Sequence, residues 1–148
     1  MALVALLDVN VLVALFDAGH VHHDVAHDWF ADHRAHGWAT CPLTELGLLR
    51  LMANPHFLPN PLRLSQAVDN LRTFCASGHH HFWSDTISIR DEGSFAADMT
   101  RGHQQLTDVY LLGLAARRGG TLVTFDRGVS LSAVKGATSE HLTVVAPA

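Results

Sequence analysis

The sequence has 148 residues, enough for one domain with a hydrophobic core of its own. Its 48% hydrophobic and 16% charged residues exclude a disordered or fibrous protein, and no apolar run reaches the ~18 residues of a membrane-spanning helix. The formal net charge of −4 excludes attraction of nucleic acid by overall charge, so any polyanionic ligand requires a local basic patch.

The chain shows no internal repeat, low-complexity linker or domain boundary, so residues 1–148 are expected to form a single domain. The two cysteines, Cys41 and Cys75, are too few for a disulfide framework. A reducing cytoplasm is therefore the expected location, with no membrane attachment.

The N-terminal third predicts two strands and two helices. Residues 3–7 (LVALL) form a continuous apolar run, typical of a central parallel strand covered on both faces. This run has no basic leader and continues directly into Asp8, so we expect a buried strand and not a signal peptide. Helices are expected at residues 10–16 and 22–36, and a second strand at 38–41.

The middle of the chain is less regular. Pro42 suits the first position of a helix that continues to residue 53, and a loop with three prolines follows at 55–61. Residues 62–76 predict a helix with one apolar side. A short strand is expected at 81–83, and one helix around 91–100.

The last third has the clearest pattern. Residues 107–118 predict a helix with Thr107 or Asp108 as its cap, and two glycines end it. A strand is expected at 121–125, a turn at 126–128, and an edge strand at 142–145. This alternation of strands and helices predicts an α/β fold with a mainly parallel sheet.

Four acidic residues, far apart in the sequence, fall at equivalent places in this fold: Asp8, Glu45, Asp108 and Asp126. Asp8 and Asp126 directly follow strands, and open α/β sheets bind ligands beyond the carboxyl ends of their strands. Asp108 and Glu45 lie at helix starts, which face the same edge. We therefore expect the four carboxylates to converge.

Converging carboxylates repel one another, and a divalent cation relieves that repulsion. Ligands that are all oxygen favour Mg²⁺, with Mn²⁺ as a substitute, over zinc. Such a site activates water and orients a phosphodiester, with one ion or with two ~4 Å apart. The predicted chemistry is phosphodiester hydrolysis.

Each acid also has a structural interpretation. Asp108 can serve only as a helix cap, Asp126 only as a turn residue, and Glu45 as a first-turn acid that suits the helix dipole. Asp8 is the hardest to explain this way, because a charge directly after a buried strand is costly without a partner. The joint placement of the four acids favours a site.

Three segments carry a family resemblance: LLDVNVLVALF at 6–16, PLTELGLLRLM at 42–52 and LTDVYLLGLAARRGGTLVTFDRG at 106–128. Their order and spacing resemble the PIN-domain nucleases, and more closely the VapC toxins of toxin–antitoxin systems. The resemblance covers essentially the whole chain. It implies a three-layer α/β/α sandwich with a short parallel sheet.

The resemblance also implies Mg²⁺- or Mn²⁺-dependent RNA cleavage. It makes Asp8 and Asp108 metal-binding aspartates, Glu45 the helix glutamate and Asp126 the final acid, while Asn10 and Thr124 match polar positions beside the site. It further implies a homodimer and a cognate antitoxin whose basic or aromatic segment enters the acidic groove.

The chain departs from the family at His103–Gln105, where relatives often carry a basic residue before LTD. This departure weakens the expected phosphate contact there. Four basic residues remain as candidates for contact with the RNA backbone: Arg50, Arg101, Arg127 and Lys135. Each of them is also explained as an ordinary solvated surface charge.

Twelve histidines are a further feature. His23 and His27 have the spacing of metal ligands on a helix, but a solvated helix face is the favoured interpretation. The run at 79–81 is expected in a loop and is a second place where a metal can bind. A histidine general base acting through the RNA 2′-hydroxyl is a metal-free alternative mechanism.

Three other functions remain open at this point. A phosphatase with a nucleophilic Asp8 needs a second aspartate two residues on, where this chain has Asn10. A catalytically inactive module that only binds protein or RNA is disfavoured by the presence of all four acids. The sequence does not distinguish cleavage of DNA by the same site from cleavage of RNA.

Overall fold

The computed structural model describes residues 2–146 and contains one five-stranded sheet. Its strands lie in the order β3-β2-β1-β4-β5, and every neighbouring pair is parallel. The strands are short: β1 (Ala5–Leu7), β2 (Trp38–Thr40), β3 (His80–Phe82), β4 (Thr121–Thr124) and β5 (Leu142–Val144). The expected parallel sheet is confirmed, and β5 is an edge strand as predicted.

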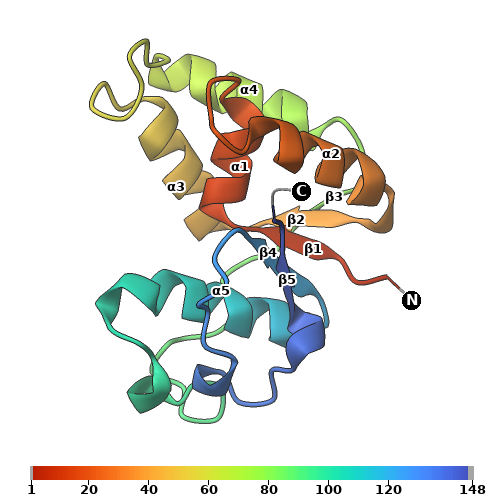
Figure 1. Ribbon diagram of the computed structural model, residues 1–148, viewed down its shortest axis with the longest axis vertical. Helices are drawn as coiled ribbons and strands as arrows, with labels where there is room; N and C mark the ends of the chain where they lie inside the picture. Colours follow the sequence, from red (N-terminus) through yellow and green to blue (C-terminus); the bar gives the residue numbers. More distant parts are fainter. Residues whose placement is uncertain (1, 147–148) are drawn as a thin grey trace.

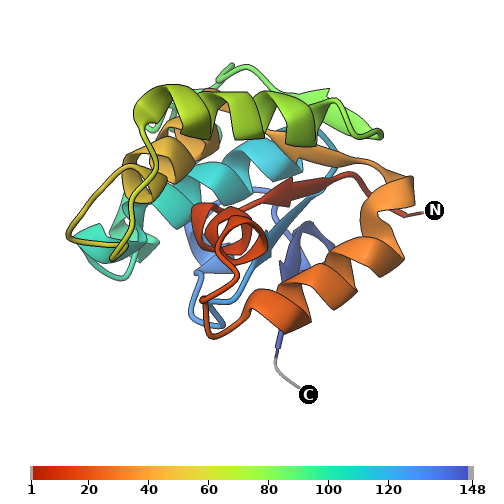
Figure 2. The same cartoon turned by 90° about the horizontal axis from the view of Figure 1, so that it is seen from above.

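Helices cover both faces of this sheet (Figure 1). One face carries α1 (Val9–Phe16), α2 (His23–His33), α3 (Pro42–Met52) and α4 (Leu64–Cys75), and the other carries α5 (Leu106–Arg117). Figure 2 views the molecule from the side of α1–α4, with the sheet and α5 behind them. No helix within residues 2–146 combines the length and the apolar character that crossing a membrane requires.

Two hydrophobic cores form because side chains alternate along each strand. In β1, Ala5 and Leu7 pack with α1–α4, whereas Leu6 packs with α5. In β4, Val123 likewise packs with α1–α4, whereas Leu122 packs with α5. The expected three-layer α/β/α sandwich is confirmed.

The strand order positions a site between β1 and β4. From β1 the chain passes to β2 and then β3 on one side, whereas β4 and β5 lie on the other side. Ligands of doubly wound sheets bind at such a reversal, beyond the carboxyl ends of the strands. Asp8 follows β1 directly, and its amide still donates to the Val123 carbonyl of β4 at 3.0 Å.

Three local predictions were wrong. Residues 91–100 hold only a 3₁₀ turn (Ala97–Met99), because the Asp91 side chain binds the Gly93 amide and the Ser94 hydroxyl and closes a turn there. The histidine run is not a loop, since β3 begins at His80. Helix α5 begins at Leu106 after a 3₁₀ turn (His103–Gln105), so its cap is Gln105.

Candidate active site

Asp8 is buried at the end of β1, with 4% of its surface exposed. Its two carboxylate oxygens have different partners: Oδ1 accepts from the Val9 amide at 2.7 Å, and Oδ2 from the Thr124 hydroxyl at 3.0 Å. Burial raises the pKa of Asp8, these two hydrogen bonds lower it, and the charge of Asp126 raises it again. Asp8 is thus held in place for a positively charged ligand.

Asp126 lies two residues beyond β4 and is exposed. Its Oδ1 accepts from the Gly128 amide at 2.7 Å, and its own amide donates to the Thr124 hydroxyl at 3.1 Å. Thr124 therefore connects the two aspartates, because its single hydroxyl donates to Asp8 and accepts from Asp126. Thr124 is one of the two polar positions that the family resemblance places beside the site.

Asp108 lies in the first turn of α5 and is half-buried. Burial raises its pKa to about 7, with further contributions from the charges of Asp8 and then Asp126. Neither ion pair found within residues 2–146 involves any of these three acids. The three carboxylates lack an ion-pair partner, and carboxylate oxygens are the ligands that Mg²⁺ or Mn²⁺ prefers. Their oxygens do not all lie within 4.8 Å of one another, so the side chains must move to hold one ion together.

Glu45 is placed differently from the three aspartates. It lies in the first turn of α3 as expected, but its Oε2 accepts a hydrogen bond from Thr40 at 2.7 Å. Burial raises the pKa of Cys75 to about 11 and lowers that of His80, and in both cases the Glu45 charge is the next contribution, which acts upwards. The charges acting on Asp8 and Asp108 come from the aspartates alone. The buried Thr40 hydroxyl draws the Glu45 carboxylate to the β2–β3 side of the fold.

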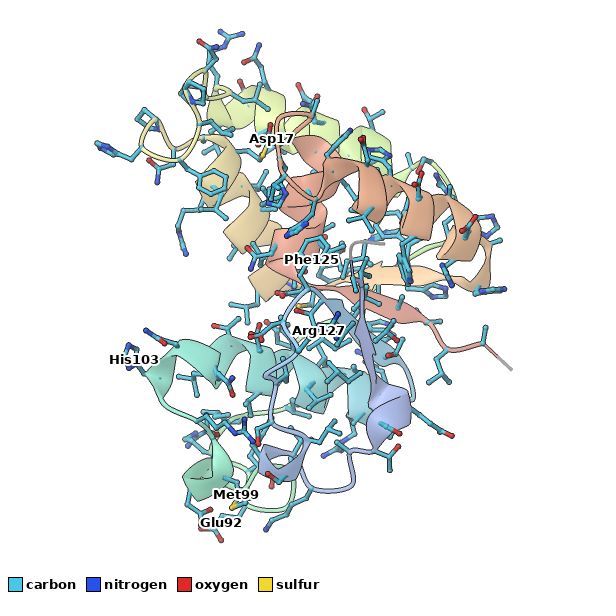
Figure 3. All side chains as sticks on the ribbon, in the orientation of Figure 1. Asp17, Glu92, Met99, His103, Phe125 and Arg127 are labelled. Carbon is cyan, nitrogen blue, oxygen red and sulfur yellow. The ribbon has the colours of Figure 1, made fainter. Side chains whose placement is uncertain are left out.

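The other predicted contact residues are spread over the surface. Asn10 is exposed in the first turn of α1. Arg50, Arg101 and Arg127 are exposed, and only Arg127 belongs to the turn that carries Asp126. Lys135 donates to the Glu92 carbonyl, and Glu92 lies at the lower end of the molecule while Arg127 is central (Figure 3). Lys135 is therefore not placed at the acidic site.

Gln105 is a site neighbour that the sequence did not reveal. Its Nε2 donates to the Gly128 carbonyl at 2.7 Å, which ties the start of α5 to the turn after β4. Its Oε1 is buried and has no hydrogen-bond partner among the described residues. The sequence showed that His103–Gln105 departs from the family pattern. It did not show that Gln105 contacts Gly128, which lies 23 residues further along the chain.

His23 and His27 have structural partners. The Nδ1 atom of His23 lies 2.6 Å from the Ala14 carbonyl, and the Nε2 atom of His27 lies 3.0 Å from the Leu15 carbonyl. Both carbonyls belong to the last turn of α1, where a helix lacks partners of its own. The expected solvated helix face is therefore partly wrong, because these two rings join α2 to the end of α1.

The comparisons with known proteins agree with this geometry. The PIN domain family matches residues 5–136. The chain is 44% identical over 140 residues to ribonuclease VapC44 of Mycobacterium tuberculosis (strain ATCC 25618 / H37Rv), covering 93% of this chain and 96% of that protein. It is 46% identical over 125 residues to ribonuclease VapC38 of the same strain, covering 84% and 86%. It is 39% identical over 132 residues to ribonuclease VapC39 of that strain, covering 89% and 95%. The chain therefore belongs to the PIN-domain family and, within it, to the VapC ribonucleases.

Proposed function

We propose that this protein is the toxin endoribonuclease of a toxin–antitoxin pair and that it hydrolyses RNA phosphodiester bonds with the help of Mg²⁺ or Mn²⁺. The observation that carries this proposal is that Asp8, Asp108 and Asp126 lie near enough at the β1–β4 edge for the charge of Asp126 to raise the pKa of Asp8, and for the charges of Asp8 and Asp126 to raise that of Asp108, in addition to burial. Relatives that are named ribonucleases over nearly the whole chain support RNA as the substrate.

The residues of the chain prepare this site before RNA binds. Val9 and Thr124 fix the two oxygens of Asp8, and Gly128 fixes Oδ1 of Asp126. Helices α1 and α5 both begin at this edge, where their N-terminal partial positive charges favour an anionic phosphate. Arg127 is the basic residue best placed to contact the RNA backbone, because it follows Asp126 directly.

The three aspartates would hold the cation, which supplies an activated water and neutralises charge on the phosphate. Glu45 remains the proposed fourth acid, since the first turn of α3 lies where the resemblance expects it. It joins the aspartates only after its carboxylate leaves the Thr40 hydroxyl, so its role is less direct than that of Asp8 or Asp108.

The proposal is tested by incubating the purified protein with total RNA and Mg²⁺, with and without EDTA. Asp8→Asn is expected to lower the cleavage rate at least about a hundredfold, because a metal-binding carboxylate contributes several kcal/mol to the transition state. Asp28→Asn is the matched control, since Asp28 is an exposed acid on α2 away from the strand ends. Cleavage that survives in EDTA, or in Asp8→Asn, would overturn the proposal.

We also propose a cognate antitoxin as the protein partner, acting with the toxin in the cytoplasm. Exposed Leu46 follows Glu45 in the first turn of α3, and exposed Leu106 begins α5, whose first turn carries Asp108, so both helix starts combine an exposed apolar residue with an acidic one. A partner segment with basic and aromatic residues complements this surface. Leu106→Asp should weaken inhibition by the antitoxin; unchanged inhibition would contradict this docking surface.

A homodimer is proposed from the family resemblance alone. Light scattering of the purified protein is expected to give the mass of two chains. A single-chain mass at micromolar concentration would contradict this assembly.

A further inference from the structure

A second group of potential metal ligands lies on the other side of the sheet edge. Glu45 of α3, Cys75 at the end of α4 and His80 at the start of β3 each offer one ligand atom, and these atoms lie within 4.8 Å of one another. All three residues are partly exposed, so an ion can reach them from solvent. No other such group of histidine, cysteine and acidic residues occurs within residues 2–146.

The surroundings hold two of these side chains in place. The buried Thr40 hydroxyl lies 2.7 Å from Glu45 Oε2 and 2.7 Å from His80 Nε2, so it connects the carboxylate to the imidazole. The His80 ring packs on Trp38, with ring centroids 4.6 Å apart. Trp38 is itself anchored by a hydrogen bond to the Gly78 carbonyl. Thr40 and Trp38 of β2 therefore support the carboxylate from α3 and the imidazole from β3.

We propose that Glu45, Cys75 and His80 bind one Zn²⁺ ion or a similar borderline-soft divalent metal. Thiolate, imidazole and carboxylate are the ligands that zinc prefers, whereas Mg²⁺ selects oxygen alone. Tetrahedral zinc needs its ligand atoms roughly 3.3–3.8 Å apart, given its ordinary bond lengths. Small side-chain rotations close the cluster from its present spacing. A water molecule fills the fourth position, and Thr40 orients the carboxylate from behind.

This site shares Glu45 with the proposed catalytic acids. When Zn²⁺ holds the Glu45 carboxylate beside Cys75 and His80, that carboxylate is withdrawn from the aspartates. Zinc occupancy therefore inhibits RNA cleavage from the β2–β3 side. The inhibition rests on the proposed nuclease function, but the binding of the metal does not.

Co²⁺ is the direct probe, because a cobalt–thiolate bond has a charge-transfer absorption that all-oxygen sites lack. Titration of the metal-free full chain in a non-thiol reductant is expected to develop this absorption to one equivalent, and Zn²⁺ is expected to displace it. The other cysteine, Cys41, has none of its surface exposed, so it does not compete for the metal.

Variants assign the absorption to the three ligands. Cys75→Ser should abolish it, and His80→Gln and Glu45→Gln should each weaken Co²⁺ binding at least about tenfold. His81→Gln is the matched control, since His81 is an exposed neighbour on the same strand. Asp108→Asn should keep the absorption, which separates this site from the aspartates. An absent absorption in the wild type would show a Thr40-centred hydrogen-bond cluster that binds no metal. Unchanged affinity in His80→Gln and Glu45→Gln would show that the metal binds without these residues, and either result would overturn the proposed site.

The regulatory consequence has its own readout. In the Mg²⁺-supported cleavage reaction, Cys75→Ser should raise the Zn²⁺ concentration for half-inhibition at least about tenfold. Equal inhibition of wild type and Cys75→Ser would place the inhibitory ion at the aspartates and overturn the regulatory role.

Discussion

Single residues determine how the acidic site is organised. Thr124 is the clearest case, because one hydroxyl donates to Asp8 and accepts from the Asp126 amide. It thereby links the Asp8 carboxylate, which follows β1, to the backbone of Asp126, which follows β4. Asp108 has no such hydrogen-bond partner among residues 2–146, and burial followed by the charges of Asp8 and Asp126 raises its pKa to about 7.

Thr124→Val tests the positioning of Asp8. The substitution keeps the volume but removes both hydrogen bonds, so cleavage should require about 10–100-fold more Mg²⁺. Unfolding free energy should fall by about 1–3 kcal/mol, because Asp8 loses a partner while buried. Thr143→Val is the matched control: it breaks the Thr121–Thr143 hydrogen bond instead. A Thr124→Val protein with the Mg²⁺ dependence of the wild type would contradict the positioning role.

Asp108→Asn tests the cost of burying a charge at Asp108 beside two other aspartates in the metal-free site. Burial and the neighbouring aspartates raise the folded-state pKa of Asp108 from 3.8 to about 7, so the folded protein retains a proton that the unfolded chain releases. Stability contributed by this group therefore falls as pH rises from about 4 to about 7.

In EDTA at pH 8, Asp108→Asn should be more stable than the wild type by on the order of 1 kcal/mol, after discounting for solvent screening of a half-exposed carboxyl. The difference should shrink towards pH 4. Urea denaturation at both pH values measures it. A less stable variant at pH 8, or a difference independent of pH, would contradict a destabilising charge at Asp108.

At the scale of elements, the close packing of α1 against α3 sets where the N-termini of these helices lie. Gly47 makes this possible, because a Cβ there would meet Val9 Cγ2 at 2.7 Å and Cγ1 at 3.3 Å. Asp8 directly precedes Val9, and Glu45 lies two residues before Gly47. The glycine thus brings the start of α3 close to the site.

Gly47→Ala is expected to destabilise the protein by about 1–3 kcal/mol, because the overpacked methyl group pushes the helices apart. In a Val9→Ala background the clash disappears, and the better helix propensity of alanine should make the same change neutral or stabilising by up to about 1 kcal/mol. Denaturant unfolding of the wild type, the two single variants and the double variant measures these differences in unfolding free energy. The same destabilisation in both backgrounds would show that Val9 is not the obstacle.

Elements with a strong local pattern were predictable from the sequence, and those defined by distant contacts were not. The apolar run before Asp8 and the regular pattern from Thr107 to Arg118 gave β1 and α5 to within about two residues, which is the usual uncertainty of helix ends. The stretch around Asp91 failed because its side chain binds nearby backbone and competes with helix formation. β3 extends through the histidine run because β2 provides a pairing edge.

At the scale of the whole molecule, the parallel topology brings together acids that are 100 or more residues apart, such as Asp8 and Asp108. Two strand ends and one helix start predicted that Asp8, Asp126 and Asp108 share this edge, and the charges of Asp8 and Asp126 do act on Asp108. The same reasoning did not place Glu45, whose position depends on a rotamer and on the buried Thr40 hydroxyl. Sequence periodicity locates a helix start, but side-chain direction depends on partners that only the packed structure supplies.

The chemistry of the RNA ends tests the central claim most directly. Attack by water activated at the aspartates forms a new bond between phosphorus and the water oxygen and breaks the bond to the 3′ oxygen, which takes up a proton. Fragments produced by the wild-type protein in Mg²⁺ should therefore carry 5′-phosphate and 3′-hydroxyl ends. Fragments with 2′,3′-cyclic phosphate and 5′-hydroxyl ends would instead indicate attack by the 2′-hydroxyl, as in the histidine mechanism, and would contradict the metal site at Asp8, Asp108 and Asp126.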